Sequence, residues 1–292
     1  MHQVVEVSTN AAQHEKWDRD KIPLFFERQL DFTRAEGAPD LIVWPETAIV
    51  ALMDSAQTSF AAMSEAAGDR PVVVGLRRLE DGRRLYNSLA VLDGAGQVAG
   101  RYDKHHLVPF GEYIPFGDVL GRFGLRGLAA GEGFGFSAGP GPVLVDIPGL
   151  GAALPLICYE GVFPRNLRGT DARARFILMI TNDAWFGQLS GPYQHLAQAR
   201  LRSAEQGLPM VRVANTGVSA VIDAAGQIVG HLPLGQAGWI DLPLPAPGKQ
   251  TFYAAFGDWP ASGLALLLLV GAYLARARPR QELTVDAGNP SA

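Results

Sequence analysis

The sequence predicts an α/β fold in which helices cover mainly buried strands. Apolar runs of strand length alternate along the chain with segments of helical spacing, which is the pattern of this class. The chain also contains 34 glycines and 20 prolines, which is high for a helical protein and predicts many turns between short strands. The pattern by itself leaves the number of sheets open.

The length and composition of the chain limit the number of domains and the kinds of partner. With 292 residues the chain can bury a sizeable core, and we expect one large domain followed by an appendage. Its 25 basic and 29 acidic residues give a net charge of -4, which gives no reason to expect nucleic acid as a partner. The first dozen residues show no signal peptide, and no internal repeat is visible.

The first half of the chain alternates between the two kinds of element. We expect strands at 4–7, 41–44, 71–76 and 85–92, a further strand ending near 102, and helices at 22–35 and 55–67. A turn at 93–96 predicts that the last two strands form a hairpin. Residues 117–141 are rich in glycine and have no period, so we interpret them as a long functional loop.

The second half continues the same alternation. We expect strands at 143–147, 152–158, 176–181, 210–214 and 218–222, a helix at 193–206, and a second hairpin around 223–226. Pro243, Pro245 and Pro247 close the domain and stiffen the connection to the C-terminal segment. The predicted boundaries are a main domain at 1–248, a linker at 249–258, a transmembrane helix at 259–275 and a tail at 276–292.

The predicted membrane span carries no charge between Trp259 and Ala275. Its length is near the lower limit for crossing a bilayer, and Trp259 and Tyr273 fit the two interfaces. Arg276, Arg278 and Arg280 come directly after it, so the positive-inside rule places the C-terminus in the cytoplasm. The alternative is a buried helix in the core of the domain.

Two charged residues stand at the ends of predicted strands. Glu46 follows the apolar run 41–45, where desolvation can raise the pKa of a carboxylate into the range of a general base. Lys104 lies in a polar and aromatic segment, where a fixed ammonium stabilises an oxyanion and lowers the pKa of a nearby thiol. The alternatives are a glutamate that caps a turn and a solvated lysine.

The single cysteine, Cys158, has no partner for an internal disulfide, so it is either a packed thiol or a reactive one. It ends the run 154–157 at a predicted junction of strand and turn, which exposes a nucleophile and aims the next backbone N–H at an oxyanion. The neighbours His105 and His106 point to opposite sides of a strand and have no third ligand at matching spacing. We therefore expect neither a metal nor a cofactor.

Several long motifs carry a resemblance to a known family. They are WPET at 44–47, YDKHHLVPFGE at 102–112, ICYE at 157–160, TNDAWFG at 181–187, GPYQH at 191–195 and NTGVSA at 215–220. The order of Glu46, Lys104 and Cys158 is similar to that of the nitrilase superfamily of carbon-nitrogen hydrolases. More narrowly, the motifs resemble the apolipoprotein N-acyltransferases of bacterial inner membranes, from about Trp17 to Arg280.

The resemblance implies an α-β-β-α sandwich followed by one transmembrane helix, with the sandwich in the periplasm and the C-terminus in the cytoplasm. It implies that Cys158 takes a fatty acyl chain from a phospholipid as a thioester. The acceptor is then the α-amine of the diacylglyceryl cysteine of an apolipoprotein. Glu46 takes the thiol proton and later the amine proton, while Lys104 and the Tyr159 N–H hold the oxyanion.

The resemblance also assigns supporting residues by position. Glu112 matches a second essential glutamate, and Asn87, Tyr159 and Glu160 match residues that support the site. Trp17 matches a tryptophan near the lipid entrance. Ordinary alternatives are that Glu112 only bridges to Lys104, that Asn87 satisfies a turn, and that Trp17 is simply packed.

Two other functions compete with this interpretation. A nitrilase-like amidase would use the same three residues on a small amide, with water in place of the amine. A membrane-tethered binding protein would keep the residues without turnover. Family members carry a bundle of transmembrane helices ahead of this domain, and this chain begins almost at its first strand, so we interpret it as part of a larger or split protein.

Overall fold

The computed structural model describes residues 2–35, 37–115, 135–170 and 172–277. Contacts between residues divide the chain into two units, the first ending at Thr251 and the second beginning at Phe252. Most of the loop predicted at 117–141 lies outside the described residues. Arg278, Arg280 and nearly all of the predicted tail also lie outside them.

The first sheet of the larger unit has six strands in the order β12-β1-β2-β3-β4-β5. Its strands are β1 (Gln3–Ser8), β2 (Leu41–Val43), β3 (Val72–Glu80), β4 (Arg84–Leu92), β5 (Val98–Asp103) and β12 (Gly238–Pro243). The central strands β1, β2 and β3 are parallel, and β12 and β4 flank them in the antiparallel direction. The helices α1 (Ile22–Thr33) and α2 (Gln57–Ala67) pack against this sheet.

The second sheet also has six strands, in the order β11-β10-β9-β8-β7-β6. They are β6 (Val145–Ile147), β7 (Gly151–Ile157), β8 (Phe176–Asn182), β9 (Met210–Asn215), β10 (Ser219–Ile222) and β11 (Ile228–Leu232). Here β7, β8 and β9 are parallel, and β6 and β10 flank them in the antiparallel direction. The helix α4 (Gly191–Gln206) packs against this sheet.

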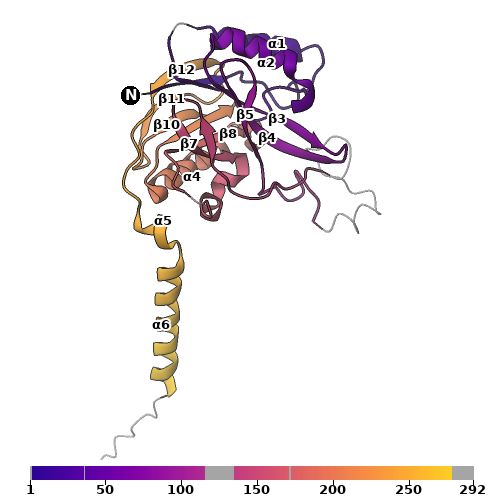
Figure 1. The fold of residues 1–292 in the computed structure, drawn as a ribbon. Coiled ribbons are helices and arrows are strands. Elements are labelled where there is room, and N and C mark those ends of the chain that lie inside the picture. The colour runs from indigo at the N-terminus through magenta and orange to yellow at the C-terminus, as the bar shows by residue number, and fades with distance from the viewer. Residues whose placement is uncertain (1, 36, 116–134, 171, 278–292) are drawn as a thin grey trace, which may run out of the picture. The chain divides into compact units, whose positions relative to one another are not determined.

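Three apolar clusters show how these elements form layers. Alternate residues of each strand point to opposite faces, so Leu178 on β8 joins a cluster between the two sheets while its neighbour Met179 packs toward α4. On the other sheet, Ile42 faces a cluster that contains Phe60 and Met63 of α2. The unit is therefore an α-β-β-α sandwich, with α1 and α2 on one side of the strands and α4 on the other (Figure 1). This confirms the predicted fold class.

The two sheets repeat one strand pattern. Each contains an antiparallel strand, three parallel strands and a hairpin, and each hairpin closes through the same turn. In the first turn, Asp93 Oδ1 accepts hydrogen bonds from the backbone N–H groups of Ala95 and Gln97, and Asp223 does the same with Ala225 and Gln227. The two turns are also similar in sequence, with VLDGAGQVAG at 91–100 and VIDAAGQIVG at 221–230, so a short repeat was present and was missed.

Most predicted elements form within a few residues of their expected ends, and both hairpins are present. The strand β12 was missed because it pairs with β1, more than 200 residues earlier, and has no partner nearby in the sequence. The helix expected at 55–67 begins at Gln57, after the short 3-10 helix η1 (Met53–Ser55). The linker predicted at 249–258 contains a helix, α5 (Phe252–Phe256).

The second unit contains one long apolar helix, α6 (Trp259–Ala277). The window Trp259–Arg276 has a mean hydropathy of 1.4, and none of it is buried. At about 1.5 Å per residue, a helix of this length reaches across most of a hydrocarbon core of about 30 Å. Its exposed leucines do not fit the alternative of a buried core helix, so α6 is long and apolar enough to cross a membrane.

We expect a chain cut after Thr251 to stay in solution without detergent, because the cut removes the apolar helix. The uncut chain should remain in the membrane pellet after an alkaline wash and need detergent for extraction. As a matched control, Leu267→Ala should keep this behaviour, whereas Leu267→Arg together with Leu268→Arg should weaken it, since each arginine costs about 3 kcal/mol at the centre of a span. Equal pelleting of the cut and uncut chains would contradict a membrane span.

Candidate active site

Glu46 lies in a tight turn directly after β2. The turn packs on Gly75 of β3 so closely that a Cβ there would lie 2.6 Å from the Glu46 Cα. The carboxylate is 6% exposed, and its Oε1 accepts a hydrogen bond from Asn87 Nδ2 at 2.6 Å. Its Oε2 accepts one from the backbone N–H of Asn182 at 2.7 Å, so the side chain bridges the two sheets.

Lys104 follows β5 and is 1% exposed. Its Nζ lies 2.9 Å from Glu112 Oε1 and 3.8 Å from Glu46 Oε1. The other oxygen of Glu112 accepts from the backbone N–H of Val108 at 2.8 Å, which fixes this carboxylate. Burial by itself lowers the pKa of Lys104, but Glu112 and Glu46 more than offset it and hold the pKa above its usual range. The side chain is therefore an ammonium ion.

Cys158 is the first residue of the 3-10 helix η3 (Cys158–Val162), directly after β7. Its φ of 52° lies in the left-handed region, which non-glycine residues rarely adopt and which clusters at functional sites. Burial raises the pKa of the thiol strongly and Glu46 raises it further, whereas Lys104 and Thr181 lower it too little to compensate. Lys104 thus lowers the pKa of the thiol, as expected, but desolvation outweighs the ammonium and the net shift is upward.

Glu160 ties the Lys104 segment to β7. Its Oε1 accepts hydrogen bonds from the Tyr102 hydroxyl and the His105 backbone N–H, and its Oε2 accepts from the Ile157 backbone N–H. Burial would raise the pKa of Glu160, but contacts with His105 and the backbone hold it below its usual range. His106, adjacent to His105, lies with its ring 5.4 Å from that of Tyr159. The structure thus places Tyr159 and Glu160 beside the predicted site.

Trp17 is 38% exposed, and its ring lies 5.1 Å from the guanidinium carbon of Arg77. The adjacent Lys16 is buried and was not singled out in the sequence. Its Nζ donates to the backbone oxygen of Glu46 at 2.9 Å and to Thr47 Oγ1 at 2.7 Å. Burial lowers the pKa of Lys16 to about 8. Nothing local distinguishes Lys16 from a solvated lysine, so only the fold reveals it.

A second set of buried polar residues was also missed in the sequence, although the position of one of them, Arg212, indicated a buried charge. Arg212 interrupts the apolar strand β9 and is completely buried, and a buried arginine needs a charged partner. It contacts Asp183, which in turn contacts His195. The motifs at 181–187 and 191–195 contained these partners, but no role followed from the sequence.

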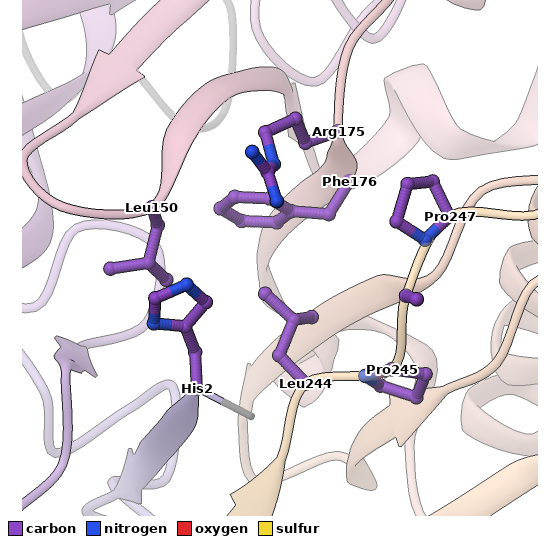
Figure 2. A pocket seen from close by; sticks show the side chains of 8 residues that line it. His2, Leu150, Arg175, Phe176, Leu244, Pro245 and Pro247 are labelled. Carbon is purple, nitrogen blue, oxygen red and sulfur yellow. The ribbon is translucent and has the colours of Figure 1, made fainter.

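The first unit contains a cavity close to the predicted site and another away from it. The nearer one, of about 320 Å³, lies behind the Glu46 turn and is lined by Lys16, Thr47 and apolar side chains that include Phe25 and Phe26. The other, of about 340 Å³, is lined by residues that include His2, Arg175 and Pro247 (Figure 2). None of the three predicted catalytic residues lines this second cavity, so it is separate from the predicted site.

Comparison with known proteins identifies a family whose model matches this chain and several relatives that are similar in sequence. The family model described as carbon-nitrogen hydrolase matches residues 11–244. An apolipoprotein N-acyltransferase of Brucella melitensis is 40% identical over 277 residues, covering 91% of this chain and 52% of that protein. One of Bradyrhizobium diazoefficiens is 43% identical over 249 residues, covering 82% and 46%. The chain thus spans about half the length of the curated relatives it matches.

Solved structures share the fold at lower identity. An amidase from Nesterenkonia sp. superposes with a TM-score of 0.60 at 20% sequence identity, over 84% of this chain and 90% of the amidase. A cysteine-to-serine mutant of the Nesterenkonia AN1 amidase from the nitrilase superfamily gives a TM-score of 0.59, also at 20% identity, over 84% of this chain and 92% of the mutant. These similarities support the two-sheet sandwich.

The raised pKa of Cys158 predicts slow alkylation at neutral pH, because only the thiolate reacts with iodoacetamide. The labelling rate should keep rising from about pH 7 to beyond about pH 9, where an ordinary thiol levels off. Lys104→Met should slow labelling further, since it removes a cation that lowers the thiol pKa. Intact-protein mass spectrometry follows the adduct, and a plateau reached below about pH 8 would show that the thiol pKa is not raised.

The lowered pKa of Lys16 predicts a pH-dependent stability. The folded pKa is about 8 and the unfolded pKa is about 10.4, so the unfolded state binds more protons between these values. The free energy of unfolding should therefore rise with pH in this window, by up to about 3 kcal/mol relative to Lys16→Met. Urea unfolding of both proteins at several pH values measures the difference. A difference that stays flat or falls would contradict a buried, charged Lys16.

Proposed function

Because the chain belongs to the carbon-nitrogen hydrolase family, we propose that it forms the catalytic region of an apolipoprotein N-acyltransferase. The observation that carries this proposal is the 40% and 43% identity to proteins of that name over 91% and 82% of the chain. That name implies a lipoprotein as the acceptor. The apolar helix α6 supports a reaction at a membrane, where both lipid substrates reside.

In the first half-reaction, Cys158 attacks the carbonyl carbon of a phospholipid ester. The raised pKa keeps the thiol protonated at rest, so a base must take its proton during the attack. We assign this role to Glu46, whose charge acts on the thiol. The sulfur–carbon bond forms, the ester carbon–oxygen bond breaks, and Glu46 returns the proton to the departing lysophospholipid alcohol. The acyl chain remains on Cys158 as a thioester.

In the second half-reaction, the α-amine of the diacylglyceryl cysteine attacks the thioester. Glu46 takes a proton from the amine, the carbon–nitrogen bond forms, and the carbon–sulfur bond breaks. The proton then returns to the departing sulfur, which restores the thiol. Lys104 and the Tyr159 N–H stabilise the oxyanion in both steps. The Lys104 ammonium donates one hydrogen bond to Glu112, so its other N–H groups can donate to the oxyanion.

The remaining predicted residues position these groups. Asn87 donates to Glu46 and to Glu112, so it sets the separation of the two carboxylates. Glu112 holds the ammonium, and Glu160 holds the segment that carries it. We assign Trp17, which is partly exposed and adjacent to Lys16, to the entrance for lipid.

The second candidate function is a nitrilase-like amidase, favoured by the fold shared with amidases. It differs only in the acceptor, because water would then discharge the thioester. We place the catalytic unit at the bacterial inner membrane, on the periplasmic side, with the C-terminus in the cytoplasm. The arginines that follow α6 in the sequence support this orientation through the positive-inside rule.

We expect phospholipid alone to add one acyl group to Cys158 in the detergent-solubilised protein, because a single nucleophile serves both substrates. A lipopeptide added afterwards should remove that group and appear as an N-acylated amide, whereas a lipopeptide with a blocked α-amine should not. Intact-protein mass spectrometry measures each step, with Cys158→Ala as the control that gains no acyl group.

Three outcomes separate the possibilities. Transfer that requires both substrates together, with no adduct from phospholipid alone, would exclude the covalent route. Release of free fatty acid at the rate of acylation would support the hydrolase. A protein that binds lipopeptide but never gains an acyl group would be a binding protein.

A further inference from the structure

A chain of buried polar side chains lies behind the nucleophile, and the reaction steps above do not use it. Arg212 on β9 and Asp183 after β8 are fully buried, and His195 on α4 is 3% exposed. Arg212 Nη2 donates to Asp183 Oδ2 at 2.8 Å, and His195 Nδ1 lies 2.9 Å from Asp183 Oδ1. The other ring nitrogen, Nε2, lies 3.2 Å from the backbone oxygen of Cys158. The chain thus ends on the nucleophile's own peptide group.

The contacts around Asp183 fix its carboxylate. Thr181 Oγ1 donates to Oδ1 at 3.0 Å, in addition to the contacts with His195 and Arg212. A Cβ at Gly217 would lie 2.1 Å from Oδ2, so the carboxylate occupies the space of a missing side chain. Burial would raise the pKa of Asp183, but Arg212 and His195 hold it below its usual range. A buried carboxylate of this kind is stable only while its partners stay in place.

We propose that Arg212, Asp183 and His195 act as a clamp that aims the Tyr159 N–H at the oxyanion. The peptide group between Cys158 and Tyr159 is trans, as are all peptide bonds in the described chain. Because this group is planar, its C=O and N–H point in opposite directions. Holding the Cys158 oxygen from behind therefore fixes the direction of the Tyr159 N–H. These three side chains are positioning residues, since none of them touches the reacting atoms.

The backbone at Cys158 explains why such a clamp is needed. The left-handed conformation of Cys158 is unfavourable for a residue with a Cβ, so it persists only when its surroundings hold it. Tyr159 is in the first turn of η3, where helix N–H groups have no partner within the helix. When His195 Nε2 carries a hydrogen, it donates to the Cys158 oxygen, which stabilises this conformation and leaves the Tyr159 N–H available.

The clamp makes a prediction that separates it from a merely structural role. Attack on a carbonyl creates an oxyanion that needs the Tyr159 N–H, whereas alkylation at a saturated carbon creates none. Damage to the clamp should therefore slow acylation of Cys158 and leave its alkylation intact. The inference rests on the proposed role of Cys158 as nucleophile, but not on the identity of the lipid substrates.

The test compares His195→Gln with His195→Asn in the full chain in detergent. The Gln amide nitrogen reaches the position of Nε2 and can still donate to Cys158, whereas that of Asn reaches only the position of Nδ1. The acyl donor is p-nitrophenyl butyrate: the thiol proton passes to Glu46, the sulfur–carbon bond forms, the ester bond breaks and p-nitrophenolate leaves. Its release measures acylation, and iodoacetamide labelling measures alkylation.

We expect His195→Asn to slow acylation about 100-fold, which is the scale of losing one oxyanion donor, and His195→Gln to stay within about fivefold of wild type. Alkylation should change less than about twofold in both, because it needs no oxyanion donor. If His195→Asn does not fold, Asp183→Asn tests the same chain: the ratio of acylation to alkylation should fall about tenfold, while alkylation itself should rise because the Asp183 charge raises the pKa of the thiol.

Two results would overturn the clamp: equal acylation by wild type and His195→Asn, or a parallel loss of acylation and alkylation, which indicates a structural role. A wild-type Cys158 that is alkylated but never acylated by the ester would remove its role as nucleophile, and the clamp with it. Acylation by the ester but not by phospholipid would instead leave the clamp standing and count against the proposed substrates.

Discussion

The ammonium of Lys104, held between two carboxylates away from water, is the contact on which the candidate site depends. An uncompensated buried charge costs several kcal/mol, so Lys104, Glu112 and Glu46 are stable only when all three are in place. They come from the end of β5, the loop after it and the turn after β2, which fixes how these segments meet. Asn87 of β4 donates hydrogen bonds to both carboxylates and so connects β4 to Glu46 and Glu112.

This arrangement determines how the thiol can be activated. An isolated thiolate would be a further negative charge in a buried space, and burial together with Glu46 accordingly raises the pKa of Cys158. Transfer of the proton to Glu46 leaves the net charge of the site unchanged, so it avoids that cost. Lys16, which is electrostatically coupled to both Glu46 and Cys158, adds a second cation on the far side of the turn. For the proposed reaction, these charges favour a base that acts during the attack over a thiolate formed beforehand.

The sequence was sufficient where the determining signals are local. Strands such as β8 are continuous apolar runs, so they were predictable. Glu46 and Cys158 follow runs of this kind, whereas Lys104 follows the mixed strand β5, and the catalytic roles of the three residues stay predictions. The pairing of β12 with β1 and the burial of Lys16 depend on residues distant in sequence, and no local pattern indicates them. Arg212 is intermediate, because its place inside an apolar strand signals a buried ion pair but does not identify Asp183 as the partner.

The repeated strand pattern of the two sheets shows why the site requires both. Glu46 follows the middle parallel strand of the first sheet, and the corresponding strand of the second sheet ends at Asn182, whose N–H holds Glu46 at 2.7 Å. Cys158 follows a strand of the second sheet, while Lys104 follows a strand of the first. Neither sheet carries Glu46, Lys104 and Cys158 together. The apolar cluster between the sheets, which includes Val43 and Ile157, therefore brings these groups together as it buries the core.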